Sequence, residues 1–422
     1  MAFWTLSVVC LLGLNDFAHM LTGVERVFSP LLLVCCVVAL AELLRVRLTV
    51  ALGTSGVLIL SALVSYAGIG IVVSIVTGSD VRSDAVFHLA RHVNSVLLIV
   101  ATALGGRVVW ARIGGEGLLR GLLVVMAASC VLMLAHPWLM EAYVLLPQDG
   151  AVRFSGSFSN PNNAGLVACL TVALALAFVC AGRFRPFADG VLLAAGAALV
   201  LTLSRTALVV LPALLAHSLL ASRGIERRRL AGVLALAGVV VAGSFTSLTG
   251  ALQNSQLARL ESLVQIVDSR SIDDVSLAGR LTLWRAAADM ALEAPLFGHG
   301  LGRLHQLDTG LYDEDGNPQG AHNQYLVLVG ESGFIPLVLF MAFLWTMARL
   351  GPRRQALLGA VSGWALVLGV FSVTAHGILT NRPCNFLIGV ACVALATEVR
   401  EKRRPSLQRS PPTPLHRCLR RV

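Results

Sequence analysis

Charged residues are scarce in this sequence. Asp, Glu, Lys and Arg make up only 13% of the 422 residues, whereas soluble chains carry roughly a quarter. This scarcity excludes a multi-domain soluble enzyme. Hydrophobic residues make up 56% of the chain, which excludes disorder, because so apolar a chain does not stay solvated. The class that remains is a helical protein that crosses a membrane many times.

Motifs for metal or redox chemistry are missing as well. The nine cysteines include no CxxC pair, and eight of them lie in or beside apolar runs, as expected of small buried hydrophobic residues. The histidines do not form a metal-binding spacing such as HExxH. We therefore predict neither a metal site nor a cofactor.

What the chain does contain is a series of apolar runs of about 20 residues, each long enough to cross a membrane as a helix. We expect an all-α bundle of about twelve spans, centred near residues 12, 37, 63, 98, 125, 174, 197, 211, 236, 339, 366 and 390. The seventh and eighth spans are nearly fused, with a turn at 202–206. The expected organisation is helices 1–9 in residues 1–249, an outward loop at 250–322, helices 10–12 at 323–399 and a basic tail at 400–422.

Lysine is almost absent, since Lys402 is the only one among 33 cationic residues. Twenty-two of the 33 lie in alternate loops and in the tail. By the positive-inside rule that side faces the cytoplasm, with both termini inside. Basic clusters also occur in nucleic-acid-binding chains, but topology and contact with anionic membrane lipids explain them better. No nucleic-acid partner is predicted.

The other eleven arginines face outward or lie within the membrane, and Arg205 is the sharpest anomaly. It lies between two apolar spans, where a charge is costly and by default marks a function. One interpretation is a side chain that extends to the nearest lipid head group. The other is a ligand site, for which phosphate fits best, because the guanidinium binds it with two hydrogen bonds and stays charged.

The outward loop at 250–322 is long enough to be functional or to carry its own structure. Apolar spacing predicts a helix at 255–267 and a second helix at 278–292, which ends before Pro295. In the second helix Arg280 and Trp284 share a face. This pair is either a cation stacked on the indole ring or a second phosphate clamp.

A shorter outward loop ends at residue 163 in a run rich in serine and asparagine. This run is either a turn followed by a helix N-cap or a set of amides presented to a sugar. Both interpretations remain open.

His322 lies where the long loop re-enters the membrane and is followed by Asn323. A lone histidine is often only a structural hydrogen-bonding group. At this boundary, however, a neutral ring is able to accept a proton from an attacking hydroxyl. Glu331 comes nine residues later, about 2.5 turns along one helix, so we expect it on the opposite face and consider it the weaker partner.

These motifs together resemble the O-antigen ligase/polymerase superfamily. The similarity rests on Gly279-Arg280 with Trp284, the PLFGHG run at 295–300, His322-Asn323, and Glu331 with Gly333; Ser204-Arg205-Thr206 and Phe158 with Asn160 and Asn162 add to it. Pro336 departs mildly from the family pattern. The motif block covers residues 153–333, and the twelve-span outline matches the rest.

The resemblance implies a GT-C type glycosyltransferase of the bacterial inner membrane. Such a ligase transfers a polysaccharide from undecaprenyl diphosphate to a sugar hydroxyl of lipid A–core on the periplasmic side. Arg205 and Arg280 would stabilise the diphosphate leaving group, and His322 would act as base in an inverting attack. Further contacts to diphosphate or glycan are predicted from Arg153, Arg285, Arg303, Trp284, Asn162 and Asn323.

Other functions remain possible. An O-antigen polymerase uses the same donor with a second lipid-linked glycan as acceptor, and a protein O-oligosaccharyltransferase transfers the glycan to a protein. A transporter is the alternative outside the enzymes. Transporters often have matching halves and broken helices at the membrane midplane, whereas here no halves match and the polar residues gather in one outward loop.

Overall fold

The computed structural model describes most of the chain. The described residues are 1–22, 37, 48–77, 83–135, 155–158, 160–202, 204–222, 224, 227–232, 235, 275–305, 307, 309–311, 319–349, 355–375 and 377–403. Several expectations lie outside them: most of the spans near residues 37 and 236, the helix at 255–267, Arg153 and the tail beyond residue 403.

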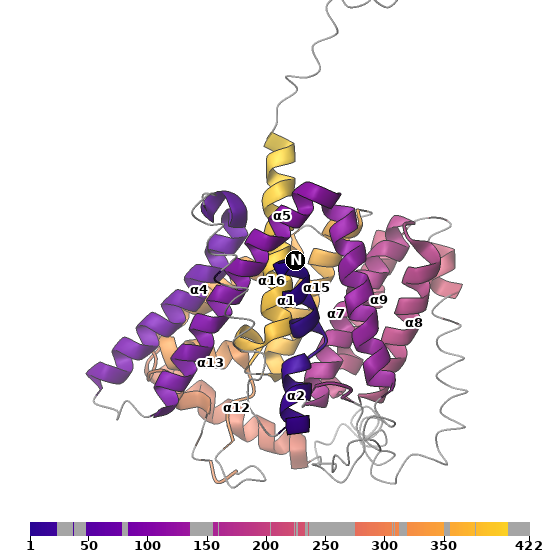
Figure 1. Cartoon of the computed structure of the whole chain (residues 1–422). Helices are drawn as coiled ribbons and strands as arrows, with labels where there is room; N and C mark the ends of the chain where they lie inside the picture. Colours follow the sequence, from indigo (N-terminus) through magenta and orange to yellow (C-terminus); the bar gives the residue numbers. More distant parts are fainter. Residues whose placement is uncertain are drawn as a thin grey trace, which may run out of the picture.

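The described residues form helices and no strands, as an apolar membrane chain requires. The helices in chain order (Figure 1) are α1 (Ala2–Leu11), α2 (Leu14–Thr22), α4 (Leu48–Val76), α5 (Ser83–Leu134), α7 (Pro161–Ala181), α8 (Arg185–Leu201), α9 (Arg205–Ala221), α12 (Val275–Glu293), η1 (Arg303–His305), α13 (Gln324–Ser332), α14 (Phe334–Ala348), α15 (Ala356–Thr374), η2 (Ile378–Thr380) and α16 (Arg382–Arg403).

Four of these helices are long and apolar enough to cross a membrane: Leu52–Val76 in α4, Ala85–Leu134 in α5, α7 and α15. Helices α1, α9 and α14 are apolar but shorter. The all-α expectation is therefore confirmed for the described residues, which include four candidate membrane spans, while the count of about twelve spans stays a prediction.

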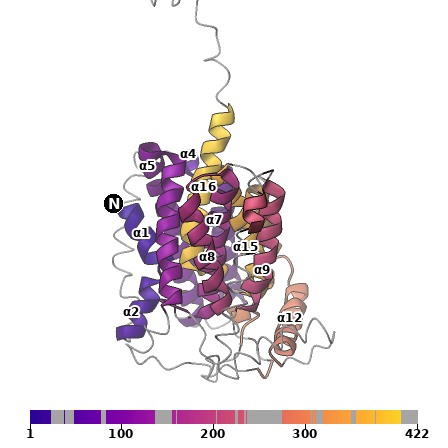
Figure 2. The same cartoon turned by 90° about the vertical axis from the view of Figure 1, so that its right-hand side faces the viewer.

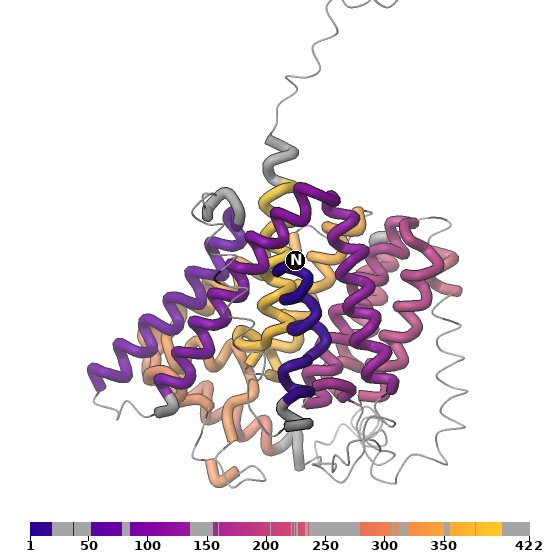
Figure 3. The backbone as a smooth tube through the Cα atoms, in the orientation of Figure 1, coloured from indigo at the N-terminus to yellow at the C-terminus, as the bar shows by residue number. Residues whose placement is uncertain are grey.

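Helix α5 contains two of the expected spans. Its 52 residues bend sharply at Gly114, where φ is 75° and ψ is 170°, a conformation that glycine adopts without strain. The two arms run in opposite directions from this bend (Figure 3). The loop expected between these spans is thus a single sharp turn.

One end of the bundle carries paired arginines, and we call it the arginine-rich end. Glu116 lies 2.6 Å from Arg120 and 3.7 Å from Arg183, which joins the bend of α5 to the turn between α7 and α8. Arg229 pairs with Asp189 of α8 at the same end. The last turns of α16 project from this end too (Figures 1 and 2).

We call the opposite end the site end. Here the hydroxyl oxygens of Thr206 and Thr374 lie 2.7 Å apart, which joins the start of α9 to the end of α15. The Asn381 amide donates to Asn163 Oδ1 at 3.2 Å, which joins the starts of α16 and α7. Helix α12 lies across this end (Figures 1 and 2).

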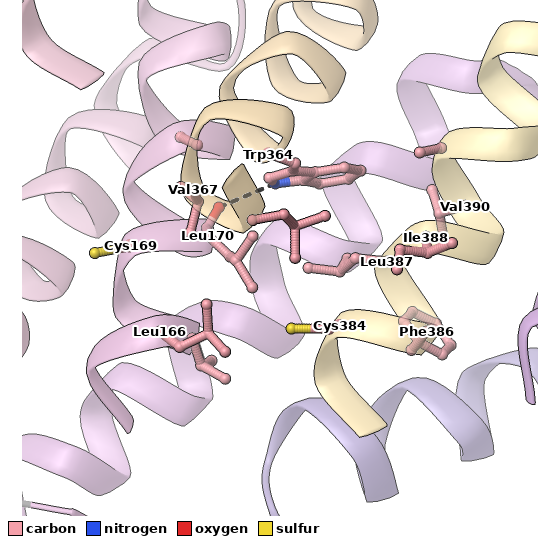
Figure 4. Packing of buried hydrophobic residues seen from close by; sticks show 14 of the residues in the cluster. Leu166, Cys169, Leu170, Trp364, Val367, Cys384, Phe386, Leu387, Ile388 and Val390 are labelled. Atoms are coloured by element: carbon pink, nitrogen blue, oxygen red, sulfur yellow. Dashed lines mark hydrogen bonds between the residues drawn. The ribbon is translucent and has the colours of Figure 1, made fainter. Parts of the chain in front are cut away.

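Helix α7 is the centre of the bundle. Every residue from 164 to 180 is buried, because a helix that is apolar on all sides packs in the interior. The Trp364 indole of α15 donates to the Leu170 carbonyl at 3.1 Å (Figure 4). Asn160 Oδ1 accepts from the Asn162 N–H at 2.7 Å and caps the helix, so the N-cap interpretation of this run is confirmed.

Candidate functional site

The segment that follows α12 builds the site. Helix α12 ends at Glu293, close to the predicted end, and the PLFGHG run at 295–300 follows as an irregular loop. The loop packs against the break between α13 and α14. This break lies at Gly333, where φ is 78° and ψ is −173°. A helix interrupted beside a polar loop is a common way to build a site in a membrane protein.

Close backbone contact explains two glycines of the motif. A Cβ on Gly298 would lie 2.3 Å from the carbonyl carbon of Glu331, and a Cβ on Gly333 would lie 2.0 Å from the carbonyl oxygen of Leu296. Both residues have positive φ. Three backbone hydrogen bonds then join the loop to the broken helix: His299 N–H to Gly330 O at 2.8 Å, Gly300 N–H to Glu331 O at 3.0 Å, and Phe334 N–H to Pro295 O at 3.0 Å.

Glu331 is the polar centre beneath this loop and is fully buried. Its Oε1 accepts from the Leu304 N–H at 2.9 Å and lies 3.0 Å from His305 Nδ1. Its Oε2 accepts a short hydrogen bond from the Tyr66 hydroxyl of α4. A buried carboxylate is tolerated only with such partners.

Two histidines of α5 extend this polar centre. The rings of His88 and His305 lie 4.1 Å apart between centroids, and those of His92 and Tyr66 lie 4.7 Å apart. His92 Nδ1 is 2.7 Å from the His88 carbonyl oxygen, to which it donates. We call Tyr66, His88, His92, His305 and Glu331 the buried polar cluster.

His322 lies in the segment that leads into α13, within electrostatic range of His305 of this cluster. Its φ is 45°, so it is not helical, and α13 begins only at Gln324. The expectation that His322 and Glu331 occupy opposite faces of one helix is therefore wrong, because His322 does not belong to the helix that contains Glu331. Burial lowers the pKa of His322, and the positive charge of Arg280 lowers it further. His322 therefore stays neutral near pH 7.

The structure thus brings Arg280 of α12 within electrostatic range of His322, and both are half-buried. Arg205 is also half-buried and is the first residue of α9 at the site end. Ser204 precedes it with a buried hydroxyl that has no hydrogen-bond partner among the described residues. A guanidinium at a helix N-terminus forms part of an environment suited to an anion.

The other predicted contact residues differ in how exposed they are. Arg285, Arg303 and Asn162 are exposed, and Trp284 is half-buried on α12. Asn323 is buried and caps α13, because its Oδ1 accepts from the N–H groups of the two residues after Gln324 at 3.0 and 3.2 Å. Their roles in binding stay predictions.

Sequence reasoning missed the buried polar cluster. It considered Glu331 only as a partner of His322 and His305 only as a further histidine, and it did not consider Tyr66, His88 or His92. One signal was present: Glu331 interrupts an apolar stretch, and a carboxylate there needs a partner for the same reason that Arg205 does.

Fold and site together define the class: the chain is a multi-pass helical membrane protein with a cluster of buried titratable groups beside an interrupted helix. Residues 190–341 match the family model described as O-antigen ligase. The match supports membership of the O-antigen ligase family and a glycosyltransferase of the O-antigen ligase/polymerase type. No curated protein matches the chain. The matched segment contains Arg205, Arg280, His322 and Glu331.

Proposed function

We propose that the chain is an O-antigen ligase. It transfers a polysaccharide from undecaprenyl diphosphate to a sugar hydroxyl of lipid A–core. The observation that carries this proposal is the pair formed by Arg280 and His322, a cation beside a neutral imidazole within the family-matched segment. Transfer from a lipid diphosphate needs both groups: one for the leaving phosphate and one for the acceptor proton.

In this mechanism Arg280 and Arg205 bind the diphosphate and stabilise the charge that develops on it as the glycosidic bond breaks. His322 accepts the proton of the acceptor hydroxyl, whose oxygen attacks the anomeric carbon from the opposite face, with inversion. Arg153, Arg285, Arg303, Trp284, Asn162 and Asn323 provide further contacts to diphosphate or glycan. The proposal assigns no step to a metal or a cofactor.

The membrane orientation follows from the two ends of the bundle. The arginine-rich end faces the cytoplasm with both chain termini, as the positive-inside rule favours. The site end faces the periplasm of a bacterial inner membrane, where the outward loop at 250–322 meets the lipid-linked donor and the lipid A–core acceptor.

A polymerase of the same superfamily remains the second candidate, because the family match covers both activities. Lipopolysaccharide profiles of a deletion strain, with and without the restored gene, distinguish the two. A ligase predicts loss of all O-antigen bands with accumulation of lipid-linked polymer. Core carrying a single repeat would indicate the polymerase, and an unchanged ladder would reject both.

The effect of the Arg280 charge on His322 predicts a pH dependence. Because Arg280 lowers the pKa of His322, Arg280→Gln raises that pKa toward its ordinary value. The neutral imidazole is then lost at a higher pH, so the acidic limb of the kcat/KM profile moves to higher pH and the rate at pH 6 falls more than the rate at pH 8. Arg228→Gln, an exposed change at the arginine-rich end, should leave the limb in place. If the acidic limb does not move in Arg280→Gln, the charge of Arg280 does not control the protonation of His322, and the prediction is contradicted.

A further inference from the structure

Glu331 has no role in the transfer chemistry proposed above, yet its buried carboxylate accepts three hydrogen bonds. Its carboxylate accepts from Tyr66 of α4, from the Leu304 backbone and from the ring of His305. These donors come from two segments, α4 and η1, that are distant in sequence from α13. The carboxylate therefore fastens three parts of the chain to one another.

A short chain of hydrogen bonds leads from this carboxylate to His322. Glu331 accepts from the Leu304 N–H at 2.9 Å, and the Leu304 carbonyl accepts from the Ala321 N–H at 2.9 Å. Ala321 is fully buried and directly precedes His322. Two hydrogen bonds thus link the carboxylate to Ala321, the residue directly before the one that carries the imidazole.

Packing contacts also hold η1 in place. The His305 ring lies against His88 of α5, and a Cβ on Gly320 would lie 2.7 Å from the His305 carbonyl oxygen. The 3₁₀ turn η1 therefore contacts the Glu331 carboxylate on one side and the backbone segment that leads to His322 on the other. A displacement of η1 is expected to displace His322 with it.

We propose that Glu331 is a positioning residue that sets the location of His322 through η1, with Tyr66 and His305 holding the carboxylate in place. The inference rests on the proposed function only for the catalytic role of His322. The positioning of His322 by Glu331 is argued from the contacts alone. Glu331 is not itself the base, because it is fully buried and three groups already donate to it. A fully satisfied buried network of this kind rigidifies what it connects.

Chemical modification tests the proposal without turnover. The purified full-length chain in detergent is treated with diethyl pyrocarbonate at a pH well above the ordinary histidine pKa, so that the rate reports exposure and not protonation. Carbethoxylation of His322 is followed by peptide mass spectrometry. His217 of α9, which bonds to Ser362 at 3.0 Å, is the internal reference for global loosening.

We expect Glu331→Ala to raise the modification rate of His322 several-fold while that of His217 stays unchanged. Glu331→Gln keeps an acceptor for the Leu304 N–H and should restore most of the protection. Tyr66→Phe removes one donor and should give a smaller increase, which keeps the test decisive if the alanine variant does not fold. Trp364→Phe is the matched control, because it removes another buried interhelical hydrogen bond and should leave His322 unchanged.

The proposal is overturned if the rate at His322 is unchanged in both Glu331→Ala and Tyr66→Phe, or if it rises in step with the rate at His217. Neither outcome bears on whether His322 is the base, since no substrate is present. Conversely, full transfer activity without the His322 imidazole would show that His322 is not the base, and it would not affect the conclusion from the modification experiment.

Discussion

Replacement of His322 by asparagine is expected to lower kcat about 10²- to 10⁴-fold, the range that a general base contributes. Asparagine is the right substitution because His322 has a φ of 45°, and asparagine tolerates this left-handed region better than alanine does. The backbone and the fold should therefore stay intact while the proton acceptor is lost. The measurement is the steady-state rate of glycan transfer, together with the thermal unfolding midpoint in detergent.

The control for this experiment is His217→Asn. His217 is on α9 and bonds to Ser362 of α15, away from Arg280 and the PLFGHG loop. Its replacement should leave the rate unchanged. Wild-type activity in His322→Asn, at equal protein level, would remove His322 from the mechanism.

Replacement of Gly333 by alanine should prevent normal folding of the site. The backbone there, with φ 78° and ψ −173°, is a region that only glycine occupies easily, at a cost of about 1–3 kcal/mol for other residues. The added Cβ would also lie 2.0 Å from the Leu296 carbonyl oxygen, so the loop at 295–300 would have to move. We expect a total loss of about 4 kcal/mol or more, which places the change among the most severe single substitutions.

The matched control is Gly196→Ala in α8. A Cβ at this helical position meets nothing within 4 Å, and alanine favours a helix over glycine by about 1 kcal/mol. Size-exclusion profiles and unfolding midpoints in detergent compare the two variants. A monodisperse Gly333→Ala protein with the wild-type midpoint would show that the close contact with Leu296 is not required.

The sequence was sufficient to predict the features that depend on local chemistry. Apolar spacing and Pro295 predicted the second loop helix, which is α12, and the polar residues at 202–206 predicted the turn between α8 and α9. The serine- and asparagine-rich run indicated a helix cap as one of two interpretations, and Asn160 provides that cap. In each case neighbouring residues determine the structure, so a short window of sequence contains the information.

The buried polar cluster depends instead on contacts between distant segments. Tyr66 and Glu331 are 265 residues apart, and periodicity within one helix does not indicate which helix lies opposite. The break at Gly333 and the left-handed conformation of His322 also changed the geometry, because a continuous helix from His322 onward would have directed Glu331 elsewhere. Sequence analysis placed the carboxylate on the face opposite His322, and it did not predict that His305 and Tyr66 are its partners.

The most direct test of the central claim is glycan transfer by the purified full-length chain. The reaction contains undecaprenyl-diphosphate-linked O-polysaccharide, lipid A–core and EDTA, because arginines and not a metal are assigned to the leaving group. Products are separated by gel electrophoresis. The account predicts a ladder of polysaccharide attached to lipid A–core with the wild-type chain and none with His322→Asn. Absence of the ladder with the wild-type chain, or an equal ladder with both proteins, would contradict it.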